Sequence, residues 1–472
     1  MNDCFYGKKK LKYLNIKQLY FLTSVIVALT ATVAQADDKP IDLLEDPLPY
    51  QGVGQIPDRP PLLVELGDPF LATGDLDKGF MWPTGSVWQP RFSGYLINRA
   101  VVQTRDNGIQ SAQTEFVDRL DLYGNLQLSG TERVMVGIRP LDLNTPNRFT
   151  KWVIDSDTEE EGTQEYFNAQ IRTLFFEGDL GSMFPLLDPQ GFGPLDFGIN
   201  VGRQNILLQD GSFINDDLDA LGLVRNNIHL TDVMNLRVSL LWAWDQVDQG
   251  QLLEETNGDL YILSTAFDTY TTTWNIDAAW MNDQEDEPED DGYYVALAAT
   301  QRIGYWNTTF RVNASMTDEE STDVQDGILY IMELSRTPTG THDVFYINLF
   351  AASDHYTMVG REPVVSGPLA PVGILFEGSG VGAYGSELDS FAKDAFGGAM
   401  GYQWIWDDYK QNLSLETAYK GDTQESQDDV AFGFQYQKRL NAHTLLQVDG
   451  FTAFSEDAKP QHGLRCEIQI IY

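Results

Sequence analysis

The sequence predicts an all-β protein, a transmembrane antiparallel β-barrel of about 18 strands with a polar lumen. The first observation is alternation: within 305–316, Phe310 and Val312 share one phase, whereas Arg311 and Asn313 share the other. A period of two places these sets on opposite faces of a strand. Short turns and long acidic loops also alternate along the chain. No helical stretch separates the strands, so a closed barrel, apolar toward lipid, satisfies the backbone polar groups.

The predicted barrel occupies residues 91–472. Its strands are expected at 91–104, 117–128, 131–140, 166–178, 194–207, 217–230, 233–245, 259–268, 272–281, 292–303, 305–316, 327–336, 342–352, 394–406, 409–420, 429–439, 442–454 and 462–472. If the first strand leaves the periplasm and the last returns to it, the strand number must be even; the short turns then lie in the periplasm and the long loops outside. The segment 179–193 fits poorly, because it falls on the periplasmic side and is too long for a turn.

Residues 1–90 precede the barrel. Lysines from Lys8 to Lys17, the apolar stretch 19–33 and the site Ala34-Gln35-Ala36 predict a secretory signal at 1–36. An uncleaved anchor is the alternative, although the apolar run is shorter than a spanning helix needs. Residues 37–90 are rich in Pro and Gly and are not strand-like. This segment is expected to be a periplasmic leader or to lie in the lumen.

Negative charge is concentrated in the loops predicted to lie outside. The formal net charge of -39 excludes a nucleic-acid partner, which needs basic surface. Acidic runs lie at 155–161 and 283–291. They are interpreted as solvated, self-repelling loops, or alternatively as sites for divalent cations near lipopolysaccharide. The runs lack the spacing of an EF-hand.

Positive charge lies on the polar phases of the strands instead. Arginines on these phases are Arg119, Arg133, Arg139, Arg172, Arg237, Arg311, Arg439 and Arg465. Arginines that line a pore favour anions. The alternative is that they pair with lumen acids, such as Asp121 and Glu467, and hold the wall rigid. Both interpretations hold together if the paired charges leave a net bias.

A resemblance to a known family follows from one region. The stretch from Asp196 to Gln204, the pair Asp210-Gly211 and the stretch from Leu221 to Arg225 resemble the alginate-export type of outer-membrane porin. The resemblance implies an eighteen-strand barrel with an arginine-rich pore for an anionic polysaccharide. Two features depart from that pattern. The acidic loops would repel such a polymer, and Arg203 shares its phase with apolar residues, so that a bulge at Gly202 would be needed to turn it inward.

The sequence contains no motif that indicates an enzyme or a cofactor site. The five histidines lack metal-ligand spacing, and no Gly-x-Ser-x-Gly motif occurs. The two cysteines, Cys4 and Cys466, form neither a disulfide framework nor a metal motif. No enzyme activity, no cofactor and no metal are therefore expected.

We expect a porin of the Gram-negative outer membrane that passes a hydrophilic, anionic or oligosaccharide-like solute passively. Membrane lipid, lipopolysaccharide and the outer-membrane assembly machinery are the other expected partners. The final strand ends on the aromatic Tyr472, which resembles the assembly signal of outer-membrane proteins, with Tyr in place of the more usual Phe. Alternatives are a plugged structural or adhesive barrel that acts through its acidic loops, and a barrel subunit of a larger envelope complex.

Two predictions concern the constriction. The residues expected to line the pore are Arg119, Arg133, Arg172, Arg203, Arg225, Arg237 and Arg311, with Arg172, Arg203, Arg225 and Arg237 along one side. The glycine-rich loop 353–393 is expected to fold into the pore, because it is the longest loop and carries fewer acids than the other outside loops. The alternative for this loop is a disordered outer segment.

Overall fold

The fold is known from a computed structural model. It describes residues 60–68, 77–108, 112–143, 149–157, 159–189, 193–245, 247, 258–283, 291–317, 324–359, 367–382, 384, 387–424, 428–456 and 459–472. The predicted signal at 1–36 and the residues of the acidic run 284–290 lie outside the described residues.

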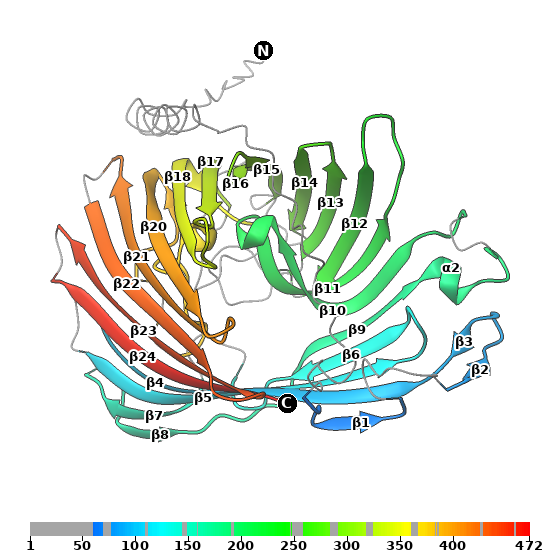
Figure 1. Cartoon of the computed structure of the whole chain (residues 1–472), viewed down its shortest axis with the longest axis horizontal. Helices are drawn as coiled ribbons and strands as arrows, with labels where there is room; N and C mark the ends of the chain where they lie inside the picture. Colours follow the sequence, from blue (N-terminus) through cyan, green and yellow to red (C-terminus); the bar gives the residue numbers. More distant parts are fainter. Residues whose placement is uncertain are drawn as a thin grey trace, which may run out of the picture.

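Eighteen long strands close into a single antiparallel barrel (Figure 1). They are β4 (Arg91–Asp106), β5 (Gln113–Gln127), β6 (Arg133–Ile138), β9 (Ile171–Asp179), β10 (Gly198–Leu208), β11 (Ile214–Arg225), β12 (Asn235–Asp245), β13 (Gly258–Asp268), β14 (Thr272–Asp283), β15 (Gly292–Ile303), β16 (Trp306–Thr317), β17 (Gly327–Arg336), β18 (Val344–Tyr356), β20 (Ala395–Trp406), β21 (Gln411–Asp422), β22 (Asp428–Arg439), β23 (Thr444–Ser455) and β24 (Gln461–Ile471). The last strand pairs with the first, with Cys466 opposite Val102. The strand number is confirmed, and each predicted strand corresponds to one observed strand.

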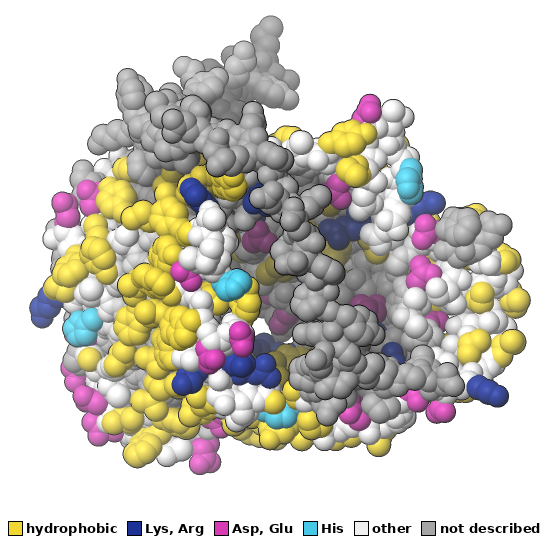
Figure 2. All heavy atoms as spheres, viewed as in Figure 1, with side chains coloured by type: hydrophobic (Ala, Val, Ile, Leu, Met, Phe, Trp, Pro, Cys, Tyr) yellow, Lys and Arg dark blue, Asp and Glu magenta, His cyan; other side chains and the backbone are white. Residues whose placement is uncertain are grey.

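The two phases of each strand face opposite sides of the barrel wall, as predicted. On β16, Arg311 and Asn313 are buried on the lumen side, whereas Phe310 and Val312 are exposed on the outer side. Exposed apolar side chains continue over the outer face of the wall, and they gather in yellow over the strands at the left of Figure 2. Such a surface is compatible with lipid and not with water.

Several short elements were not predicted. The segment at 141–165, predicted to be a loop, contains β7 (Thr150–Asp155) and β8 (Gly162–Gln164). Here β7 pairs with the outer half of β5 and extends the wall, a long-range pairing that local alternation cannot reveal. Within the proline-rich segment, β1 (Val64–Leu66) pairs with β4, and β2 (Phe80–Met81) pairs with β3 (Val87–Trp88). The connection after β9 contains α2 (Leu180–Met183), and β19 (Ala392–Lys393) precedes β20. No helix in the described ranges is long and apolar enough to cross a membrane.

Candidate pore constriction

The long loop between β18 and β20 folds into the barrel, as predicted. Its described part contributes a group of apolar side chains, Leu369, Val372, Leu375, Phe376, Tyr384 and Leu388, to a buried cluster. These side chains pack against small residues of the wall, among them Ala399 on β20 and Ala418 on β21. Burial of a Leu or Phe side chain contributes about 1.5–3 kcal/mol, so the apolar contact holds this loop in place. The loop is a fixed lining of the lumen.

Polar side chains further along the wall, on β4 and β5, bind the main chain of this loop. Arg99 and Gln103 on β4 donate hydrogen bonds to the carbonyl oxygens of Ser379 and Val381, each at 3.2 Å. Arg119 on β5 donates to the carbonyl oxygen of Gly380, also at 3.2 Å. The loop therefore lies against one continuous stretch of the wall, from β17 through β20–β23 to β4 and β5.

The tip of the β10–β11 hairpin also enters the lumen. Ile206, Leu208 and Leu218 on one face of the hairpin pack against lumen-facing residues of the wall, including Ala243 on β12 and Ile262 on β13. The 3-10 turn η2 (Gln209–Gly211) is held there by Arg311. That guanidinium donates to the side chain of Gln209 at 3.1 Å and forms an ion pair with Asp210. Sequence reasoning missed this insertion, because the connection is too short to stand out as a long loop.

The bend that admits the hairpin occurs at Gly202. No register shift occurs there, so the predicted bulge at Gly202 is wrong; the irregularity lies between Asp219 and Ala220 on β11. Gly202 instead has a φ of 121°, and a Cβ at this position would lie 2.2 Å from the carbonyl oxygen of Leu174. Only glycine tolerates this conformation and this close approach.

Replacing Gly202 with alanine is expected to destabilise the barrel. The strained φ and the clash with the Leu174 carbonyl together predict a loss of about 1–3 kcal/mol in the free energy of unfolding. Gly130→Ala is the matched control, because a Cβ at Gly130 meets nothing within 4 Å. Urea unfolding in detergent micelles measures both; equal midpoints for the two variants would contradict the role given to Gly202.

Beyond the bend, Arg203 lies on the hairpin face that looks into the lumen. Its guanidinium binds both carboxylate oxygens of Asp219, at 2.9 and 2.8 Å. Leu207 and Asn215 belong to the same face and line a cavity together with Glu333 and Pro371. The bend at Gly202 therefore turns a nominally lipid-facing phase toward the lumen.

An alternating row of guanidinium and carboxylate groups runs along the β4–β9 side. Asp121 accepts from Arg119 at 2.8 Å and from Arg139 at 2.7 Å. Asp142 in turn binds Arg139 at 3.3 Å and Arg172 at 3.0 Å. Three guanidiniums and two carboxylates alternate in this row, so that each carboxylate binds two guanidiniums. The pairing expected of the lumen arginines is therefore present here, and their effect on selectivity stays a prediction.

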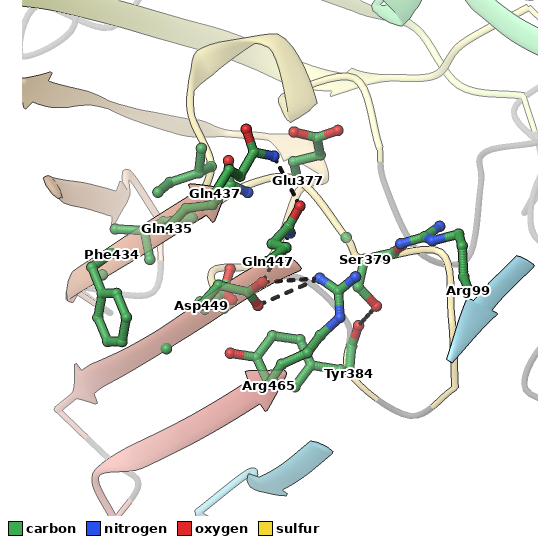
Figure 3. A pocket seen from close by; sticks show the side chains of 16 residues that line it. Arg99, Glu377, Ser379, Tyr384, Phe434, Gln435, Gln437, Gln447, Asp449 and Arg465 are labelled. Atoms are coloured by element: carbon green, nitrogen blue, oxygen red, sulfur yellow. Dashed lines mark hydrogen bonds and ion pairs between the residues drawn. The ribbon is translucent and has the colours of Figure 1, made fainter. Parts of the chain in front are cut away.

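A cavity of about 350 Å³ lies between the loop and the strands β22 to β24 (Figure 3). Arg465 on β24 forms ion pairs with Asp449, at 3.2 Å, and with Glu467. Arg99 binds Glu467 from the neighbouring strand at 2.6 Å and also lines the cavity. Gln435, Gln437 and Gln447 add amide groups to the same wall. The cavity thus presents two guanidiniums beside carboxylates and amides.

Burial raises the pKa of two loop carboxyl groups at this cavity. Burial raises the pKa of Glu387 well above its usual value, against the opposing charge of Arg105. Burial also raises the pKa of Glu377, although Arg465 and Arg99 lower it. A raised folded-state pKa contributes stability that is complete below the unfolded-state pKa and is lost as the pH rises through the folded-state value.

The barrel is therefore expected to lose stability as the pH rises from about 4, near the ordinary glutamate pKa, toward the raised folded-state pKa values of these two groups. Glu387→Gln should flatten this dependence, because the amide carries no charge to bury. Glu160→Gln, at an exposed outer position, serves as the control. Urea midpoints across this pH range provide the measurement, and an unchanged slope in Glu387→Gln would contradict the prediction.

The predicted pore residues fall into separate groups. Arg119 and Arg172 belong to the row described above. Asp217 interacts electrostatically with Arg172, and it lies on the same face of the hairpin as Arg203. Arg133 is the first residue of β6, and its Nε lies 2.6 Å from a carboxylate oxygen of Glu177. Arg237 interacts electrostatically with Asp277, a residue that faces the lumen.

Arg225 lies apart from the other predicted residues. It shares the outer phase of Leu221 and Leu223, and its guanidinium lies 5.1 Å from the centre of the Phe197 ring. The structure does not bring it to the side of Arg172. Arg99 was missed, because its lumen-facing phase on β4 also carries Ile97 and Val101 and therefore shows no clear alternation. The selectivity roles of all these arginines stay predictions. Among the described residues, no group of three His, Cys, Asp or Glu could hold a metal ion.

Comparison with known proteins identifies the fold. No protein-family model and no curated protein matches the sequence. A BenF-like porin from Pseudomonas fluorescens Pf-5 matches with a TM-score of 0.55 and 9% identity, over 81% of this chain and 98% of that chain. OpdK of Pseudomonas aeruginosa with vanillate matches with 0.53 and 10%, over 81% and 98%. OccK2 (OpdF) of the same species, in complex with glucuronate, matches with 0.53 and 9%, over 80% and 97%. The fold is that of Gram-negative outer-membrane porins.

Proposed function

We propose that this protein is a passive outer-membrane channel for a small hydrophilic solute that carries a carboxylate. The observation that carries the proposal is the run of guanidinium groups along the lumen, Arg99, Arg119, Arg139, Arg172 and Arg465. Guanidinium binds carboxylate in a two-point geometry, and a row of such groups offers successive sites of similar strength. Passage through a pore requires such sites, because a solute must bind and then leave.

The lumen inserts support a small solute over a polymer. The loop and the β10–β11 hairpin occupy the lumen from two sides, and the cavity beside Arg465 measures about 350 Å³. OpdK and OccK2 carry vanillate and glucuronate in their structures, and both molecules are small carboxylates. The resemblance to alginate-export porins remains the basis of the alternative, an anionic polysaccharide.

Recording in planar bilayers tests the proposal. The purified protein should give discrete conductance steps and, in a salt gradient, a reversal potential that indicates a preference for anions. Glucuronate or vanillate on one side should reduce the current, because a bound solute blocks the ions. Absence of steps from a folded barrel would favour the plugged structural barrel, and a preference for cations would contradict the role of the arginines.

Two further expected partners remain proposals. We infer that β24, which ends at the penultimate residue and pairs with β4, presents the C-terminal strand to the outer-membrane assembly machinery. We also infer that lipopolysaccharide is a partner, because the acidic runs 155–161 and 283–291 belong to loops expected on the outer side. Loss of folded protein on replacing Tyr472 with Ser, measured as the heat-modifiable band in isolated membranes, tests the first inference.

A further inference from the structure

Two segments that the barrel pattern leaves unexplained meet at the end of the wall that bears the short turns. The hairpin of β2 and β3 comes from the proline-rich segment, and α2 comes from the long connection after β9. A Cβ at Gly85 in the hairpin would lie 2.9 Å from Leu186 and 3.3 Å from Pro185. Trp82 stacks on Trp88 with 4.1 Å between ring centroids. The contact makes one small unit from two distant parts of the chain.

This unit lies on the outer side of the wall. Gly178 on β9 pairs with Ile199, which shares the phase of the exposed residue Val201. A Cβ at Gly178 would point toward the Met183 sulfur, at 3.0 Å, and toward Glu132, at 3.2 Å. The hydroxyl of Ser86 donates to Glu132 at 3.2 Å. Both α2 and the hairpin are therefore seated against the lipid-facing phase, next to the apolar surface of the barrel.

Six exposed side chains of this unit are large and apolar. We call them the apolar shelf: Phe80, Met81, Trp82, Val87, Leu186 and Leu187. Met81 is 76% exposed, and Leu186 and Leu187 are each 72% exposed. Hydrophobic side chains are visible at the right end of Figure 2, where Figure 1 places α2, β2 and β3. A group of large apolar side chains in one exposed place indicates an interaction surface.

We propose that the apolar shelf inserts into the interfacial region of the periplasmic leaflet. The shelf continues the lipid-facing surface, because it is seated on the same outer phase as Phe176 and Val201. Exposed charged residues, Asp77 and Lys78, flank the shelf, and Trp and Phe are residue types that concentrate where hydrocarbon meets the headgroups. The periplasmic side follows from the short turns, which lie at this end of outer-membrane barrels. The shelf thereby fixes the depth of this side of the barrel in the bilayer.

Spin labels on the full-length chain test the proposal. In a Cys4→Ser and Cys466→Ser background, single labels are placed through Met81→Cys and Leu187→Cys. Leu240→Cys, which is 54% exposed on the lipid-facing wall, and Thr231→Cys, in an exposed turn, are the controls. The protein is reconstituted in vesicles of phosphatidylethanolamine and phosphatidylglycerol. Power saturation then gives the accessibility of each label to oxygen, which enters lipid, and to a water-soluble nickel chelate.

The ratio of oxygen to nickel accessibility at Met81 and Leu187 should approach that at Leu240 and exceed that at Thr231. Ratios equal to that at Thr231 place the shelf in water and overturn the proposal. Low accessibility to both reagents, with dipolar broadening between labels, shows that a second copy covers the shelf and also overturns it. Leu187 belongs to a different segment from Met81, so failure of one variant to fold leaves the test intact.

Discussion

Removal of residues 362–386 is expected to raise the single-channel conductance several-fold, with the barrel still folded. The described part of this segment includes Leu369, Leu375 and Phe376, which are buried against the small residues of the β20–β23 wall. It also includes the carbonyl groups that accept hydrogen bonds from Arg99 and Arg119. Without this lining, the strands enclose a wider aqueous path, and conductance rises with the area of the narrowest section.

A second variant keeps the full length of the loop and weakens only the contacts that hold it against the wall. Leu375→Ala with Leu388→Ala removes buried contacts, at about 2–5 kcal/mol for each Leu→Ala change, and loosens the loop. The current should then fluctuate between the level of the unmodified protein and that of the deletion. Heat-dependent mobility on gels shows whether each variant has folded. An unchanged conductance in a folded deletion variant would falsify the role of this loop in the constriction.

Arg203→Glu is expected to shift the reversal potential strongly toward cations. The substitution changes the charge on the lumen face of the β10–β11 hairpin by two units and places a second carboxylate beside Asp219. Arg203 and Asp219 are in contact in the structure, with N–O distances of 2.8 and 2.9 Å. The change acts inside the lumen, where charges bias the ions that pass. Measurement in a salt gradient across a planar bilayer gives the sign and the size of the shift.

Two matched variants show whether charge in the lumen is the cause. Arg225→Glu makes the same change on the outer phase of β11, where the guanidinium lies over Phe197; it should leave the reversal potential nearly unchanged. Arg203→Glu combined with Asp219→Arg reverses the pair and keeps its net charge, so that selectivity should return. Equal shifts in Arg203→Glu and Arg225→Glu, or no shift in either, would refute the assignment of Arg203 to the lumen.

The barrel itself could be predicted from the sequence, because its signals are local. On β16, Phe310 and Val312 alternate with Arg311 and Asn313, and every such alternation fixes two faces within a few residues. Turn signals such as Gly304 fix where each strand reverses. An even number of strands then follows from the positions of both ends. The entry of the 353–393 loop into the lumen was also predictable, from its length and its glycines.

Tertiary structure decided what fills the lumen and which charges meet there. The sequence marks Gly202 as the place where Arg203 could turn inward, through a bulge; its positive φ and its contact with Leu174, with no bulge, arise only when β9 and β10 are paired. Arg99 and Glu467 are 368 residues apart, and they meet because the barrel closes by pairing its first and last strands. The alternation of apolar and polar residues along a strand predicts the face on which each side chain lies. The partner of that side chain depends on how distant strands and inserted loops occupy the same enclosed space.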